Sequence, residues 1–252
     1  MLEFHGVSAQ KHPQLPAEAQ PRLCTEELRS TLAWIKERFA FLTPEQLLSG
    51  DQPGILLTFD DGLANNFTNA LPVLEEVHAP AVFFVTTQHV SDPKDWLPAT
   101  LRQAELARQY WSDISESVES NLWNGMSIEQ LRRAAESPLI TIGSHTISHP
   151  SLIYCDDKTL EQEVCGSKSF LEEQIGKEVD LFAYPTGPYD QRVLQAVADA
   201  GYRAAFVEES WSLGPVAFEI PRIGIYESSA GYLGLKLSGF FRRPITSRPV
   251  QT

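Results

Sequence analysis

Two histidines stand four residues apart in the segment ITIGSHTISHP, residues 140–150, in a chain of 252 residues with only six histidines. A second segment, LLTFDDG, places the carboxylates of Asp60 and Asp61 side by side after an apolar run. Each segment alone has an ordinary explanation, because Asp-Gly is common in turns and isolated histidines are often solvated. Together, one carboxylate and the imidazoles of His145 and His149 make a three-ligand site for a divalent ion, with positions left open for water and substrate.

The two neighbouring aspartates are not expected to act alike. Neighbouring residues on a strand point to opposite faces, so one carboxylate is expected to bind the ion while the other stays free. A bound dication lowers the pKa of its water toward about 7, and a free carboxylate beside it serves as a base. The predicted reaction class is therefore metal-dependent hydrolysis.

The elements around these residues alternate between strand and helix. Apolar runs of strand length are separated by helical patterns at 25–39, 157–176 and 190–202, which favours parallel strands joined by right-handed crossovers. The pattern predicts one α/β domain over residues 1–252, a distorted (β/α)7 TIM-like barrel with its chemistry at the carboxyl ends of the strands. The expected strands are Leu2–Val7, Ile55–Phe59, Ala81–Thr86, Leu139–Gly143, Leu181–Tyr184, Ala204–Val207 and Glu219–Ile225.

One connection is too long for a simple crossover. Residues 88–138 separate two predicted strands and carry Trp96, Trp111 and Trp123, three of the five tryptophans. A crossover usually needs a short loop and one helix. Two explanations of this insertion stay open: a platform or lid for the substrate, or an additional helical layer that packs on the barrel or on a second subunit.

Composition narrows the classes of partner and the compartment. The net charge of −13 disfavours nucleic acid and anionic lipid surfaces, so a small or neutral partner is expected. The start, MLEFHGVSAQ, lacks the basic and apolar regions of a signal peptide, and no apolar run reaches the ~20 residues of a membrane span. Cys24, Cys155 and Cys165 follow no disulfide pattern. We therefore expect a cytoplasmic protein with packing cysteines, and we leave the oligomeric state open.

The motifs resemble those of the NodB-like polysaccharide deacetylases, carbohydrate esterase family 4. TFDDG resembles the first motif of the family, SHTISHP the second and FAYPTGPYD the third, in the same order along the chain. The resemblance implies that Asp60 is the catalytic base and that Asp61, His145 and His149 hold one divalent ion. It also implies that the backbone N–H of Thr186 stabilises the oxyanion. Zinc is the expected metal, although cobalt, nickel, manganese and iron suit the same ligands.

The chain lacks two residues of the family pattern. The third motif has no arginine to steady the base, and no histidine follows His149 to act as the acid. His5, at the end of the first predicted strand, is expected to supply the acid, as in permuted members of the family, since an imidazole can protonate a departing amine near neutral pH. Arg222 in IPRIGI is expected to orient Asp60. The alternatives are a solvated terminal histidine and an ordinary surface ion pair. The remaining histidines are expected to be solvated: His12, His78 and His89.

The function predicted from these residues is metal-dependent removal of N-acetyl groups from an amino sugar, a cytosolic precursor of a surface polysaccharide. One alternative is hydrolysis of another small amide, formamide or imide. A second alternative is a catalytically degenerate barrel that binds a sugar, which the missing late histidine favours. The segment YLGLKLSGFFRRP, residues 232–244, is expected to be a helix that closes the barrel rather than an amphipathic membrane helix.

Overall fold

Parallel strands form the centre of the structure, a computed structural model that describes residues 1–208 and 216–238. Eight strands pair side by side in the order β10-β1-β4-β5-β6-β7-β8-β9. A small second sheet pairs β2 with β3. The strands are β1 Leu2–Phe4, β2 Val7–Ser8, β3 Leu23–Cys24, β4 Leu57–Phe59, β5 Ala81–Val85, β6 Ile140–Ser144, β7 Leu181–Ala183, β8 Ala204–Val207, β9 Ile220–Pro221 and β10 Ile223–Gly224.

The last segment closes the sheet into a barrel. β9 pairs with β8 and β10 pairs with β1, and only Arg222 separates β9 from β10. The N–H of Arg222 donates to the carbonyl of Val207, and the N–H of Ile223 donates to that of Met1. With β9 and β10 counted as one position, seven strand positions form the wall of the barrel, which confirms the predicted (β/α)7 fold. The predicted strand Glu219–Ile225 is broken because it changes partner at Arg222.

Alternate residues of the strands point into the barrel and out toward the helices. On β5, Val82 and Phe84 belong to the cluster inside the barrel, whereas the alternate residues belong to the cluster that packs with the helices: Ala81, Phe83 and Val85. Gly143 of β6 faces Phe84, and a Cβ at this glycine would lie 2.5 Å from the phenyl ring. That inward position therefore has no room for a larger residue. The inner cluster consists of Leu56, Val82, Phe84, Leu181, Ala183, Ala204 and Phe206.

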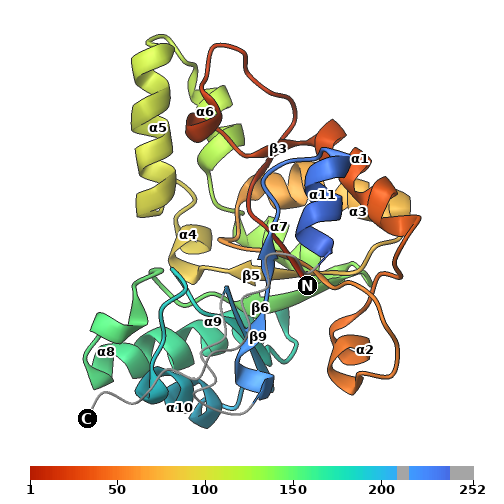
Figure 1. The fold of residues 1–252 in the computed structure, drawn as a ribbon. Helices are drawn as coiled ribbons and strands as arrows, with labels where there is room; N and C mark the ends of the chain where they lie inside the picture. Colours follow the sequence, from red (N-terminus) through yellow and green to blue (C-terminus); the bar gives the residue numbers. More distant parts are fainter. Residues whose placement is uncertain (209–215, 239–252) are drawn as a thin grey trace, which may run out of the picture.

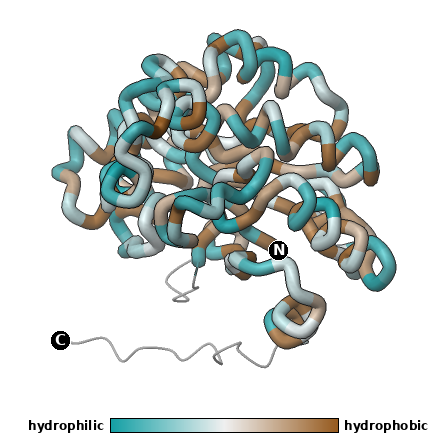
Figure 2. Tube along the Cα trace, turned by 90° about the horizontal axis from the view of Figure 1, so that it is seen from above, coloured by the Kyte–Doolittle hydropathy of each residue, from teal (hydrophilic) through white to brown (hydrophobic). Residues whose placement is uncertain are grey.

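Helices cover the outside of the barrel (Figure 1), and hydrophobic and hydrophilic residues alternate along them (Figure 2). The three predicted helical patterns are confirmed, although the one at 157–176 contains a π-helical turn. The α-helices are α1 Thr25–Lys36, α2 Pro44–Ser49, α3 Leu71–Val77, α4 Thr87–Ser91, α5 Pro98–Tyr110, α6 Glu116–Trp123, α7 Ile128–Glu136, α8 Asp157–Glu161, α9 Ser167–Ile175, α10 Gln191–Asp199 and α11 Ala230–Leu237. Shorter turns are 3-10 helices at Ala17–Ala19, Leu152–Tyr154 and Val216–Phe218, and π-helices at Asn66–Ala70 and Gln162–Gly166.

The first predicted strand, Leu2–Val7, is in fact two strands. β1 stays in the barrel, and β2 leaves it to pair with β3. The N–H of Val7 donates to Asn65 Oδ1 at 2.9 Å, and a Cβ on Gly6 would lie 2.9 Å from a side chain of the loop after β4. The chain turns out of the barrel here because this close approach suits glycine. The turn leaves His5 at the carboxyl end of β1.

The long connection at 88–138 contains more than a crossover helix. Its last helix, α7, packs on β6, whereas α5 and α6 stand away from the barrel beside residues 9–22 (Figure 1). We call residues 9–22 and 98–123 the α5–α6 lobe. Trp96 and Trp123 meet edge to face at 5.7 Å between ring centroids. The lobe has a hydrophobic cluster of its own, so it is an additional packed layer: Leu15, Ala19, Ala104, Ala107, Leu122 and Trp123.

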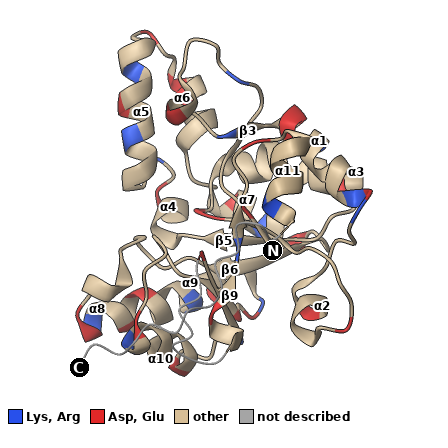
Figure 3. Cartoon of the chain, viewed as in Figure 1, with Lys and Arg blue, Asp and Glu red and all other residues tan. Residues whose placement is uncertain are grey.

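Three expectations from composition concern the surface of the molecule. Acidic side chains are spread over the outer helices (Figure 3), in line with the net charge of −13. Within residues 1–208 and 216–238, no helix combines the length and the apolar character needed to cross a bilayer. All three cysteines are free thiols. α11 contains the start of the helix predicted at 232–244, and the part from residue 239 onward lies outside the described residues.

Candidate metal and active site

The strand pleat gathers several polar side chains at one end of the barrel. Asp60 lies two residues after Thr58 and four after Leu56, which points into the barrel. His145 likewise lies two residues after the inward position of Gly143. These positions share one face of their strands, and the carboxyl ends of parallel strands meet at one end of a barrel. The side chains that meet there are Glu3, His5, Thr58, Asp60, His145 and Arg222.

Asp60 and Arg222 form a buried two-point ion pair. Arg222 Nη1 donates to Asp60 Oδ1 at 2.6 Å, and Nη2 donates to Oδ2 at 2.8 Å. Burial alone would raise the pKa of Asp60, but the charge and hydrogen bonds of Arg222 outweigh burial and hold the pKa at about 2. Asp60 is thus an ionised carboxylate whose orientation is fixed by Arg222. The structure brings together the two residues that the sequence analysis paired.

Arg222 has further partners on β1 and β4. Its Nη2 lies 3.3 Å from Glu3 Oε2, and its Nη1 donates to Thr58 Oγ1 at 3.2 Å. Glu3 is 2% exposed. Burial raises the pKa of Glu3, and the charge of Arg222 opposes that rise. Glu3 was not among the residues predicted from the sequence, although an acidic residue two positions before His5 must lie on the same inward face of β1.

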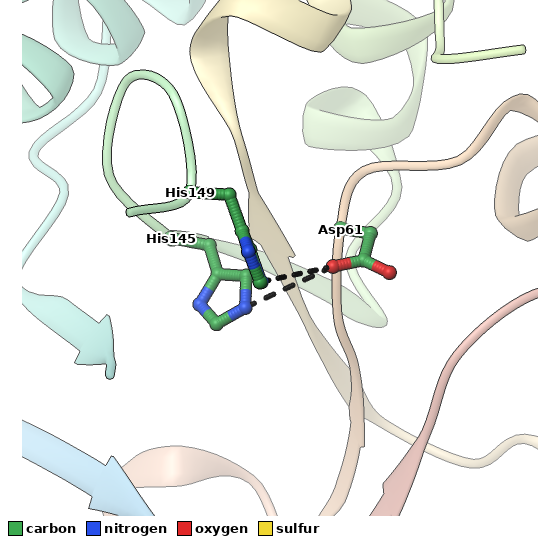
Figure 4. Close-up of side chains that lie close together, drawn as sticks. All are labelled: Asp61, His145 and His149. Atoms are coloured by element: carbon green, nitrogen blue, oxygen red, sulfur yellow. Dashed lines mark ion pairs between the residues drawn. The ribbon is translucent and has the colours of Figure 1, made fainter. Parts of the chain in front are cut away.

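Asp61 reaches the two histidines because its backbone turns back. Its φ is +75°, a left-handed conformation that is uncommon outside glycine and frequent at functional sites. Asp61 Oδ1 lies 3.5 Å from His149 Nε2 and 3.9 Å from His145 Nε2, and the three side chains converge (Figure 4). Donors bound at about 2.0–2.2 Å to one tetrahedral ion are themselves roughly 3.5 Å apart. The donor set and its spacing therefore fit a divalent ion.

His145 is prepared as a neutral ligand. Its Nδ1–H donates to the carbonyl of Ala183 at 2.8 Å, which leaves the lone pair of Nε2 directed toward Asp61. Burial lowers the pKa of His145 to about 4, despite the nearby charge of Asp60. A metal-binding histidine commonly has such a backbone partner on its second nitrogen.

The loop that carries His149 is held by Glu163. Thr146 and His149 have φ values of +68° and +60°, and such residues persist only when their surroundings fix them. Glu163 Oε2 accepts the N–H groups of Ile147 at 2.8 Å and Ser148 at 2.9 Å, and Oε1 accepts the Ser148 hydroxyl at 2.5 Å. Glu163 is 7% exposed and lies in the π-helical turn Gln162–Gly166. We infer that Glu163 is a positioning residue for His149.

We expect Glu163→Gln to weaken metal binding about tenfold, because the amide replaces one of two accepting oxygens with a donor and loosens the loop. The measurement is the zinc dissociation constant by competition with a chromogenic chelator. Glu161→Gln is the matched control, since Glu161 is exposed on the same stretch of helix and should leave the constant unchanged. Equal affinities of the two variants would contradict the positioning role.

His5 stands at the rim of the site. Its side chain is 43% exposed and its Nδ1 lies 3.9 Å from Glu3 Oε1. Its nitrogen, a Glu3 oxygen and an Asp60 oxygen all lie within 4.8 Å of one another. Its partly enclosed position would lower the pKa of His5, but the charges of Asp61, Glu3 and Asp60 outweigh this effect and raise it. A raised pKa favours the protonated imidazole, the state that a general acid needs.

The turn after β7 explains the altered third motif. Ala183 points into the barrel, while Tyr184 points outward and donates its hydroxyl to the carbonyl of Phe218 at 3.2 Å. Neither residue can replace an arginine beside Asp60, so that cation comes from Arg222. Thr186 is exposed with a φ of +59°, and its role as an oxyanion donor stays a prediction.

One of the three remaining histidines differs from the prediction. His89 is fully buried on α4, and its Nδ1–H donates to the carbonyl of Asp61 at 3.4 Å. The prediction that it is solvated is wrong, because Gly125, in the segment after α6, packs directly against it. Burial lowers the pKa of His89. His78 is exposed as predicted, and His12 is half-buried against Trp111.

A pocket opens beside these residues. It has a volume of about 240 Å³, and its walls include His5 and Asp61 from the polar end of the barrel. The pocket is also lined by Arg22 from the segment before β3 and by residues of the first turn of α5. The α5–α6 lobe is therefore both a packed layer and one wall of the pocket.

Comparison with known proteins identifies the family. The polysaccharide deacetylase family matches residues 49–205 of the chain, and the chain belongs to this family. The protein YxkH of Bacillus subtilis is 23% identical over 217 residues, which are 83% of this chain and 64% of that protein. The chain therefore spans less than two thirds of that relative. The poly-beta-1,6-N-acetyl-D-glucosamine N-deacetylase of Staphylococcus epidermidis is 23% identical over 228 residues, 85% of this chain and 72% of that protein.

A solved structure shows the same fold. The deacetylase PplD of Streptococcus pyogenes, in complex with acetate, superposes with a TM-score of 0.67 at 21% identity. The match covers 89% of this chain and 90% of that chain. It supports the barrel assignment independently of the motifs.

Proposed function

We propose that the protein is a carbohydrate N-deacetylase that uses one divalent ion, with zinc the expected metal. The observation that carries this proposal is the juxtaposition of two groups of residues. Asp61, His145 and His149 form a set of metal donors, and the ion pair of Asp60 with Arg222 lies directly beside them, with 3.8 Å between Asp60 Oδ2 and His145 Nε2. Sugar binding without catalysis does not require an ionised, buried carboxylate beside a set of metal donors.

Each residue has a role in hydrolysis of an acetamide. An ion held by Asp61, His145 and His149 supplies Lewis acidity and lowers the pKa of water. Asp60, held by Arg222, accepts a proton from the attacking water. The water oxygen first forms a bond to the carbonyl carbon. The amide C–N bond then breaks, and the products are acetate and a free amino sugar.

Two further residues complete the proton and charge balance. His5 donates its proton to the departing amine nitrogen, because its raised pKa favours the protonated imidazole and its side chain stands at the rim of the site. Thr186 N–H donates to the oxygen on which negative charge develops. The substrate is an N-acetylated amino sugar, which the name of the Staphylococcus epidermidis relative supports. A cytosolic precursor of a surface polysaccharide stays our prediction for the carrier of that sugar.

Metal content and acetate release together test this function. We expect wild type, dialysed against zinc and freed of excess ion, to hold about one zinc per chain and to release acetate from N-acetylated amino sugars. His145→Ala should lose both properties, because the Nε2 donor is removed and its cavity cannot bind the ion. Elemental mass spectrometry and an enzymatic acetate assay are the measurements.

Other outcomes point to the alternatives. Zinc binding with turnover of formamides or cyclic imides, but not of acetamido sugars, would replace the proposed substrate. Sugar binding with no turnover of any amide by the zinc-loaded protein would favour the degenerate barrel.

A further inference from the structure

The pocket beside the site is lined by residues that the proposed reaction does not use. His5 and Asp61 line it from the polar end of the barrel. Arg22 and residues of the first turn of α5, including Ala99 and Thr100, line it as well. The proposed function gives these further residues no role.

The first turn of α5 presents free backbone donors to the pocket. α5 has 13 residues and begins with Pro98, which has no N–H, and its first intrahelical bond runs from Leu101 N–H to the Leu97 carbonyl at 2.8 Å. The N–H groups of Ala99 and Thr100 make no hydrogen bond within the described part of the chain. The turn has no acidic residue. Such a helix end attracts anions through its dipole and its free donors.

Thr100 gives an independent sign of a ligand. Its side chain is 95% buried, with 5% exposed, and it lines the pocket. Its hydroxyl has no hydrogen-bond partner among residues 1–208 and 216–238. The hydroxyl itself is not among the fully buried polar atoms that lack a partner, so it is open to the pocket, where a ligand oxygen would pair with it.

Arg22, an exposed residue, adds a positive charge to the lining of the same pocket. No carboxylate among the described residues pairs with its guanidinium, in a protein with 33 acidic and 20 basic residues. Its main chain is anchored, because Lys11 Nζ donates to the carbonyls of Pro21, at 2.9 Å, and of Arg22. An unpaired arginine in so acidic a protein is available for an anionic ligand.

From these lining residues we propose that Arg22 and the first turn of α5 bind a phosphoryl group in the pocket, and that the substrate is an amino sugar that carries a phosphate or diphosphate ester next to its N-acetyl group. The inference rests on the proposed function for the N-acetyl end only. A pocket of 240 Å³ lies below the ~300–1,000 Å³ of typical ligand sites, which suits one sugar and its phosphate better than a polymer chain. Nucleotide-linked and lipid-linked sugars share this chemistry.

Binding of inorganic pyrophosphate to the metal-free protein tests the phosphoryl site without any turnover. We expect measurable binding by calorimetry in the presence of EDTA, weakened about tenfold or more by Arg22→Gln and by Thr100→Val. Arg102→Gln is the matched control, since Arg102 is exposed on the same helix and does not line the pocket; it should change the affinity less than twofold. Absence of binding in wild type, or equal affinity in all variants, would overturn the proposal.

Turnover then distinguishes the source of the phosphate. The assay compares two groups of substrates. The phosphate esters are N-acetylglucosamine 1-phosphate, UDP-N-acetylglucosamine and N-acetylglucosamine linked to a short polyprenyl diphosphate. The neutral sugars are N-acetylglucosamine and di-N-acetylchitobiose. We expect the esters to be preferred at least tenfold in kcat/KM, and Arg22→Gln to remove most of this preference by raising the KM of the esters. Equal turnover of neutral sugars would refute the phosphoryl site and leave the deacetylase function intact. Pyrophosphate binding without deacetylation of any substrate would refute the deacetylase function alone.

Discussion

Asp60→Asn should lower kcat for acetate release by about 10²–10⁴-fold, the usual contribution of a positioned general base. Asparagine keeps the shape of the side chain but cannot accept the proton of water. The ion should remain bound, because Asp61, His145 and His149 are untouched. The decisive measurements are kcat under saturating substrate and zinc content of the same preparation.

Asp61→Asn separates the two neighbouring aspartates. It should lose zinc and activity together, since Asp61 Oδ1 is the oxygen that faces both imidazoles. If Asp60→Asn kept full turnover, or if it lost the metal while Asp61→Asn kept it, the assignment of base and ligand would be wrong. Circular dichroism of both variants checks that the barrel is folded.

The sequence contained enough information for the barrel and for most of the site. Strand length, alternation with helices and the position of polar residues after apolar runs are local patterns, and they located Asp60, Asp61, His145 and His149. Alternation alone could not decide which aspartate faces the histidines. The decision comes from the left-handed backbone of Asp61, φ +75°, which turns the side chain back after β4 ends at Phe59.

Local sequence patterns could not predict the contacts between segments that are distant in the sequence. Glu163 holds the His149 loop from a π-helical turn, and nothing in its own neighbourhood marks it as functional. His89 is buried only because the long insertion folds over it. The α5–α6 lobe joins residues 9–22 to an insertion near residue 100, so its role as a pocket wall depends on three-dimensional packing rather than on sequence spacing.

Arg222→Met should reduce the free energy of unfolding by about 3–5 kcal/mol at pH 7, the cost of leaving buried charges without their partner. Arg222 is the cation that Asp60 and Glu3 share, at 2.6 Å and 3.3 Å. Methionine fills much of the same space over Phe84, which the guanidinium covers in wild type. The measurement is urea unfolding of the metal-free proteins, and Arg203→Met is the matched control. Arg203 pairs with Asp180 and Glu45 at the surface, where such pairs contribute about 1 kcal/mol or less.

The effect of Arg222→Met should also depend on pH in a definite direction. In wild type the pKa of Asp60 is depressed to about 2, so its ion pair stabilises the fold above the unfolded pKa of about 4 and is lost as pH falls through 2. Without Arg222, burial raises the pKa of Asp60 and of Glu3, and the folded variant becomes less stable as pH rises above about 4. The difference between wild type and variant should therefore widen from pH 4 to pH 7. A difference that stays constant over this range would show that lost packing, and not unpaired buried charge, accounts for the instability.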